Sequence, residues 1–171
     1  MKAEQRKNRN RMIERFIQGL LMIVLIVLTI FMMIDVNKIQ GNARVISYAG
    51  IIRGATQREI KLEISGNANN SLIRYLDDIF DGLMHGGGKY QLTKIDDQKY
   101  QNKLAKLNKA WVSLKEEIQK VRENGYENTN IINMSEDYFY LADETVTAAE
   151  NYSQHCASQL NSIEKGLIVT S

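Results

Sequence analysis

Proline is absent from the 171 residues of this sequence, and only one cysteine is present. Without proline nothing forces a break in a helix, and the many Leu, Ile, Lys and Glu residues favour long helices. A single cysteine excludes a disulfide within the chain. Two histidines are too few for a metal site of the usual closed kind, so we expect neither a metal nor a cofactor.

The one cysteine, Cys156, directly follows one of the histidines, His155. Neighbouring residues in a helix point about 100 degrees apart, so this pair cannot hold one ion from a single face. We interpret the pair as a packed thiol beside a surface imidazole.

Charge is distributed unevenly along the chain. Residues 1–15 hold six basic and two acidic side chains, a net charge of +4, whereas the remaining 156 residues hold 16 basic and 18 acidic groups. A nucleic-acid surface would spread basic charge over the folded part, so we expect no nucleic-acid partner. Basic residues beside an apolar run are instead typical of a membrane flank.

That apolar run is residues 16–34, 19 residues without a charge. At 1.5 Å per residue a helix of this length spans roughly the 30 Å hydrocarbon layer of a bilayer. The basic residues before it predict a cytoplasmic N-terminus, with everything from residue 35 onward outside the cell. No small-residue cleavage site follows, so we expect an uncleaved, single-pass anchor in the cell membrane rather than a signal peptide or a buried soluble helix.

Apolar residues recur at steps of three and four after the anchor, which predicts an all-α protein. The membrane helix continues to about Ile64, where Ser65-Gly66-Asn67 can stop it. Asn70 or Ser71 caps a second helix that Gly86-Gly87-Gly88 ends. Its predicted inward residues are Leu72, Leu76, Ile79 and Leu83.

A third helix begins at Asp96 or Asp97 and ends at Asn124-Gly125. Its predicted inward stripe is Tyr100, Leu104, Leu107, Trp111, Leu114, Ile118 and Val121. A polar loop then leads to Ser135, the predicted cap of a fourth helix. Its inward positions are Ala142, Val146, Ala149, Ser153, Cys156, Leu160, Ile163 and Leu167.

These helices predict an up-down-up-down four-helix bundle that follows the membrane helix. The predicted domains are a cytoplasmic N-terminus (1–15), the transmembrane helix (16–34), an extracytoplasmic bundle (35–165) and the start of a second membrane helix (166–171).

One basic residue interrupts the predicted stripe of the first bundle helix. The stripe is Ile39, Ala43, Ile46, Gly50, Arg53, Gln57, Ile60 and Ile64, so Arg53 is expected to point into a helix seam. A guanidinium there needs a partner, because leaving it buried alone would cost roughly 3 to 5 kcal/mol. Either an acidic residue of another bundle helix or an anion from outside the chain could serve.

The segment around Arg53 resembles a known signature. Residues 46–58, ISYAGIIRGATQR, are similar to the I-N-x-A-G-x-x-R-M-x-S-x-R pattern of the extracytoplasmic four-helix sensor regions found in nitrate/nitrite-sensing histidine kinases and in type IV pilus methyl-accepting transducers. Ala49, Gly50, Arg53 and Arg58 match the pattern, whereas Ser47 and Gly54 depart from it.

The resemblance implies a homodimer in which Arg53 and its mate grip one anion across the two-fold axis. A planar oxyanion suits two guanidinium forks, which would otherwise repel each other. The expected ligand-binding residues are Arg53, Gly50, where a small side chain lets a second helix approach, and Gln57. Arg58 lies too far around the helix to share this site, and we expect it to pair with an acid such as Glu59 or Glu63.

The leading hypothesis is therefore a sensing module of a bacterial signal transducer, of the chemotaxis or histidine kinase kind, that binds a small anion or polar solute at a dimer interface. The alternative is a membrane-anchored structural or partner-binding bundle without a small-molecule ligand. We find no nucleophile with a base and no paired catalytic carboxylates, so we expect no catalytic residues and no enzyme activity.

Overall fold

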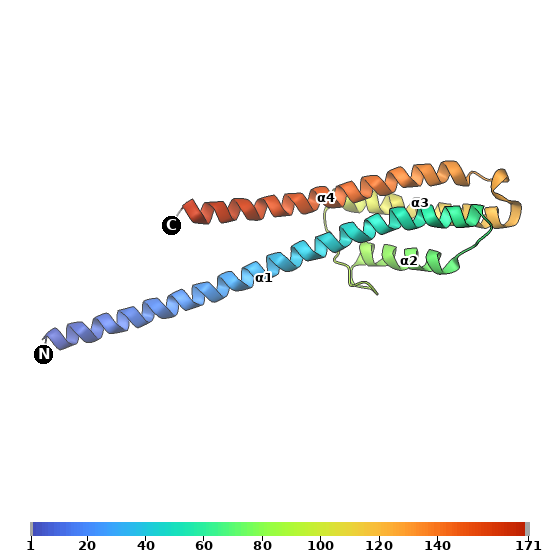
Figure 1. Ribbon diagram of the computed structural model, residues 1–171. Coiled ribbons are helices and arrows are strands. Elements are labelled where there is room, and N and C mark those ends of the chain that lie inside the picture. The colour runs from blue at the N-terminus through green and yellow to red at the C-terminus, as the bar shows by residue number, and fades with distance from the viewer. Residues whose placement is uncertain (1, 170–171) are drawn as a thin grey trace. The chain divides into compact units, whose positions relative to one another are not determined.

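The computed structural model describes the backbone of residues 2–169 and the side chains of residues 11–159 (Figure 1). Over these residues the chain is helical, without a β-strand, and the predicted all-α class is confirmed. The elements are α1 (Lys2–Ile64), α2 (Asn70–His85), α3 (Gln98–Asn124), the short 3-10 helix η1 (Tyr126–Asn128) and α4 (Ile131–Val169).

The first helix, α1, runs without a break through the apolar run to Ile64. All side chains of residues 16–34 are exposed. This part of the helix is long enough and apolar enough to cross a membrane. The chain divides into two compact units, one ending at Lys38 and the other beginning at Ile39.

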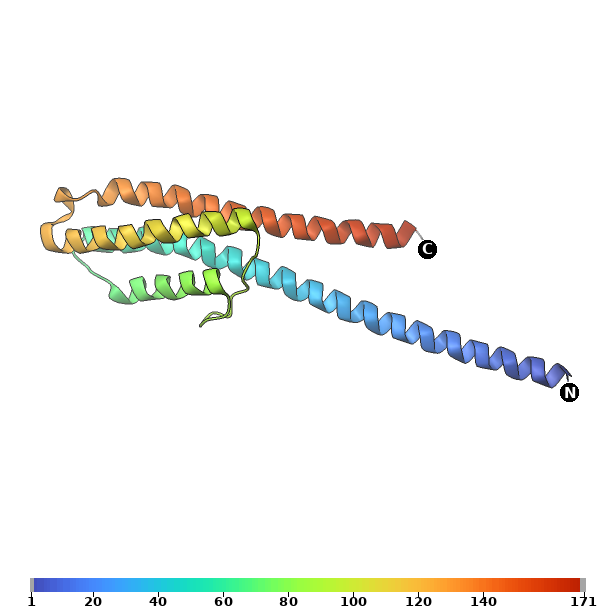
Figure 2. The ribbon, with the colours of Figure 1, turned by 180° about the vertical axis from the view of Figure 1, so that it is seen from behind.

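The second unit is the predicted four-helix bundle, made of α1 from Ile39 onward together with α2, α3 and α4 (Figures 1 and 2). The helices alternate in direction, so α1 enters and α4 leaves at the same end. The backbones of α3 and α4 lie close together. Ala142 and Ala149 of α4 are fully buried, and such small side chains allow close helix packing.

The core lies along the inner faces of the four helices. All seven predicted inward residues of α3 are buried, from Tyr100 to Val121. In α2 the prediction holds for Leu76, Ile79 and Leu83, whereas Leu72 is only half-buried and Phe80 is buried in addition. In α4 the predicted Ala142, Val146, Ala149 and Cys156 are buried and Ser153 is only half-buried, whereas Leu160, Ile163 and Leu167 lie outside the described side chains.

The predicted inward stripe of α1 is wrong by one residue. The line that the bundle buries is Asn42, Val45, Ala49, Ile52, Thr56, Glu59 and Glu63, joined by Ile60. Apart from Ile60, the predicted stripe lies at the border of this buried face or outside it, and Arg53 is only half-buried. Apolar residues occupy both lines of the helix. The buried line also contains polar residues, so the apolar pattern favoured the other one. The first bundle helix therefore brings two acidic side chains into the core.

Two predicted helix starts are also wrong. Asn69, not Asn70 or Ser71, caps α2, and its side chain accepts a hydrogen bond from the Leu72 N–H at 3.1 Å. The last helix begins at Ile131, before Ser135, whose hydroxyl donates to the Ile132 carbonyl inside the helix. The other predicted ends agree: Asp97 caps α3, and Gly86 and Gly125 follow α2 and α3.

Candidate functional site

Arg53, the centre of the predicted site, lies on the edge of α1 that faces α4. Its guanidinium donates through Nη1 to Asp143 Oδ1 of α4 and lies over the Phe139 ring, 5.8 Å from the ring centre. The side chains of Arg53 and Asp143 are 37% and 53% exposed. Arg53 is thus neutralised within the chain, by a pair that water and solutes can reach.

The other two predicted ligand-binding residues lie on the same edge. The Gln57 side chain donates through Nε2 to the Ser135 carbonyl of α4 at 3.1 Å. Gly50 is half-buried, and a Cβ placed on it would have no atom within 4 Å. Gly50 therefore does not admit a helix of its own bundle, although its surface leaves room for one from outside.

Of the two partners considered for Arg53, the acidic residue of another bundle helix is the one found. The electrostatic argument for an external anion is therefore wrong, because Asp143 already supplies the opposing charge. Anion binding by Arg53 stays a prediction. Arg58 is exposed and, among the described residues, makes no ion pair, so its predicted pairing with Glu59 or Glu63 is also wrong.

We expect Arg53→Ala to lower the free energy of unfolding by no more than about 1 kcal/mol, because exposed ion pairs contribute little. Loss of the contact with Phe139 falls within this range for an exposed site. Chemical denaturation of the two proteins followed by circular dichroism measures the difference. A loss several times larger would mean that the pair holds α1 against α4.

A second ion pair of α1 lies near the end of the helix and, unlike the exposed pair of Arg53, is buried in the bundle. Arg122 of α3 grips both carboxylate oxygens of Glu63, with Nε donating to Oε2 at 2.9 Å and Nη2 donating to Oε1. Its Nη1 donates to Asn70 Oδ1 at the start of α2. Burial acts to raise the pKa of Glu63, but the Arg122 hydrogen bonds outweigh it and hold the pKa below its ordinary value.

Glu59 lies one turn before Glu63, is 0% exposed, and neither of its carboxylate oxygens accepts a hydrogen bond. Burial, reinforced by the neighbouring Glu63, raises the pKa of Glu59 from its ordinary 4.5 to about 7, although Arg122 opposes the shift. This pair of buried acids is not predicted from the sequence. Shifting the seven-residue pattern of α1 by one position would have placed both acids inside.

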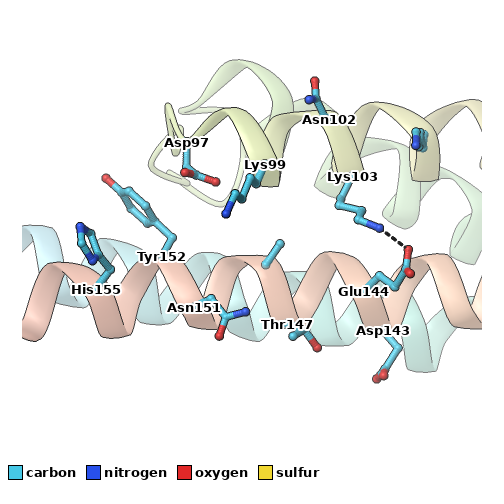
Figure 3. A pocket seen from close by; sticks show the side chains of 12 residues that line it. Asp97, Lys99, Asn102, Lys103, Asp143, Glu144, Thr147, Asn151, Tyr152 and His155 are labelled. Carbon is cyan, nitrogen blue, oxygen red and sulfur yellow. Dashed lines mark hydrogen bonds and ion pairs between the residues drawn. The ribbon is translucent and has the colours of Figure 1, made fainter.

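A groove of about 880 Å³ lies between α3 and α4 (Figure 3). Lys103 of α3 spans it and donates to Glu144 Oε2 of α4 at 2.6 Å, and Lys99 extends toward α4 without a carboxylate partner among the described residues (Figure 3). The rest of the lining is Asp97, Asn102, Lys106, Asp143, Thr147, Ala148, Asn151, Tyr152 and His155. These charges are mixed and solvated, so the groove selects no ligand class.

At the far side of this groove, His155 is exposed and Cys156 is buried, as predicted for a packed thiol beside a surface imidazole. Across the side chains that the structure describes, no group of three His, Cys, Asp or Glu residues could hold a metal ion.

Comparisons of the chain with protein-family models, with curated proteins and with solved structures found no match. The resemblance of residues 46–58 to the sensor signature therefore stays a prediction. The fold and the site together define a class: an all-α protein in which a helix long and apolar enough to cross a membrane continues into a four-helix bundle.

Proposed function

We propose that this chain is the membrane-anchored, extracytoplasmic sensing module of a bacterial signal transducer. The supporting observation is that a single helix carries both the apolar run and the buried line of the bundle. A displacement of that helix within the bundle would therefore displace the membrane segment as well. The basic residues before the apolar run support a cytoplasmic N-terminus, with the bundle outside.

The proposed ligand is a small anion or polar solute, bound between two copies of the chain at the edge that carries Arg53, Gly50 and Gln57. Three features support this position. The Arg53 side chain is partly exposed, and no atom lies within 4 Å of a Cβ placed on Gly50. In addition, the aromatic residues Phe139 and Tyr140 of α4 are exposed. Asp143 holds Arg53 in the unliganded protein, so an anion must displace this carboxylate, and binding couples to a movement of α1 against α4.

A second function is favoured by one observation, the pairing of Arg53 with Asp143. A charge already satisfied within the chain needs no ligand. The bundle would then be a membrane-anchored structural or partner-binding domain, with the exposed Ile132, Phe139 and Tyr140 of α4 as part of its contact surface.

Isothermal calorimetry of the full chain in lipid nanodiscs, against nitrate, phosphate and small carboxylates, separates the two functions. If the chain is a sensor, at least one anion binds, and Arg53→Ala weakens it at least about tenfold, because charge-assisted hydrogen bonds are lost. Asp143→Asn strengthens binding, since the anion no longer competes with a carboxylate.

Arg44→Ala is the matched control, because Arg44 is an exposed arginine of the same helix. This variant should bind the anion with the affinity of the unmodified protein. Binding that survives Arg53→Ala would place the site elsewhere. Absence of binding by every variant, Asp143→Asn included, would favour the structural or partner-binding function.

A further inference from the structure

The buried line of α1 places two carboxylates one turn apart in the core, and among the described side chains one cation, Arg122, lies beside them. Glu59 is 0% exposed and Glu63 is 4% exposed. That cation, the Arg122 guanidinium of α3, binds Glu63. The cluster therefore carries one negative charge too many if both acids are ionised.

The hydrogen bonds show which acid is left over. Arg122 uses Nε and Nη2 on the two oxygens of Glu63 and Nη1 on Asn70. Both oxygens of Glu59 are buried, and neither has a donor within hydrogen-bonding distance. An ionised carboxylate in such a place is strongly unfavourable. A proton on Glu59 removes the charge and supplies an O–H that can donate to Glu63, one turn along the helix.

We propose that Glu59 is a proton-binding site, which holds a proton in the packed bundle and loosens the contact of α1 with α2 and α3 when the proton leaves. The inference does not depend on the proposed sensing of an anion, because Glu59 and Arg53 use different partners. Its ligand is the proton itself, taken from the medium around the bundle.

The surroundings of Glu59 set the range in which it titrates. On α1 it meets Glu63, whose charge favours the protonated form, and on α3 it meets Arg122, which favours the ionised form. The Asn69 backbone, just before α2, is a weaker influence that also favours the ionised form. No charged side chain of α4, over its described part, acts on Glu59, and the nearby Tyr138 hydroxyl accepts a hydrogen bond from Thr56 at 3.4 Å.

The direction in which stability depends on pH follows from the pKa of Glu59, which burial raises from its ordinary value of 4.5 to about 7 in the folded protein. Between these values the folded protein holds a proton that the unfolded chain has lost, so stability falls as the pH rises from about 4.5 to about 7 and is constant above. The pKa of Glu63 is shifted the opposite way, so its contribution changes only below 4.5.

The test is chemical unfolding of the full chain in detergent micelles, followed by circular dichroism between about pH 5 and about pH 8. The unfolding equilibrium constant of the unmodified protein should rise by about two orders of magnitude across this range. Glu59→Gln, which keeps the shape without the charge, should remove that rise. Glu150→Gln, at an exposed position of α4, should retain the rise, so the difference between the two variants isolates the contribution of Glu59.

Infrared difference spectroscopy provides a second measurement that needs no folded variant. The unmodified protein should show the C=O band of a protonated carboxyl at neutral pH, and the band should disappear as the pH is raised. A flat stability profile in the unmodified protein, a profile unchanged in folded Glu59→Gln, or absence of the band would each overturn the proposal. None of these results bears on anion binding at Arg53.

Discussion

Replacing Arg122 with alanine is expected to lower the free energy of unfolding by about 3 to 5 kcal/mol, because it leaves Glu63 buried without its cation. The Glu63 side chain is only 1% exposed, so its charge depends on the guanidinium rather than on water in the folded protein. Glu59 one turn away adds a second acid to the same uncompensated site. Chemical denaturation at neutral pH followed by circular dichroism measures the loss.

The matched control is Arg74→Ala on α2, where an exposed arginine donates to the Ser71 hydroxyl at 3.2 Å. This variant should lower the free energy of unfolding by no more than about 0.5 kcal/mol. The cost of Arg122→Ala should also shrink in a Glu63→Gln background, since no buried charge is then left alone. Equal losses for Arg122→Ala and Arg74→Ala would mean that the buried pair does not hold the end of α1.

The two ion pairs of α1 differ in what they can do. Arg122 and Glu63 are enclosed and joined by two hydrogen bonds, so exchanging either partner for a solute is strongly unfavourable. Arg53 and Asp143 share one hydrogen bond at the surface, and water already competes for both. The anion binding that we propose would therefore replace Asp143 at modest cost, whereas the Glu63 pair is suited to fixing the helix ends.

The sequence predicted the fold well where one apolar line stands alone on a helix. The stripe of α3, from Tyr100 to Val121, has lysine, glutamate and asparagine on its other faces, so only one orientation buries it. Asp97, Gly86 and Gly125 mark helix ends by local chemistry, which a sequence displays directly.

The prediction failed where tertiary contacts overrode the local pattern. In α1 both candidate lines contain isoleucines, and the neighbouring helices bury the one that includes Thr56, Glu59 and Glu63. Glu117 of α3 accepts a hydrogen bond from the Asn130 N–H at 2.7 Å, and this contact between distant residues supports the start of α4 before Ser135. No local signal reports such a contact.

The candidate site shows the same limit. That Arg53 needs a partner follows from its chemistry, but that the partner is Asp143 depends on the register of α4 against α1. Likewise, two glutamates four residues apart are ordinary on a helix surface. Only the packing of α2 and α3 over them makes Glu59 an acid without a donor.

Trp111 is the second position where we expect a large effect, because it connects three helices in the core. The ring is 1% exposed and lies 6.4 Å from the Phe80 ring of α2 and 6.2 Å from the Tyr138 ring of α4, centre to centre. Its Nε1 donates to Asp77 of α2 at 2.7 Å. Trp111→Ala should cost about 3 to 5 kcal/mol, measured by chemical denaturation with circular dichroism.

The next residue provides a matched control on the same helix turn. Val112 is 48% exposed, so Val112→Ala should change the free energy of unfolding by no more than about 0.5 kcal/mol. Trp111→Phe keeps an aromatic ring but loses the bond to Asp77, which Lys115 still neutralises at 2.6 Å, so it should fall between the two. If alanine at 111 and at 112 cost the same, the aromatic contacts would not be what joins α2 and α4 through α3.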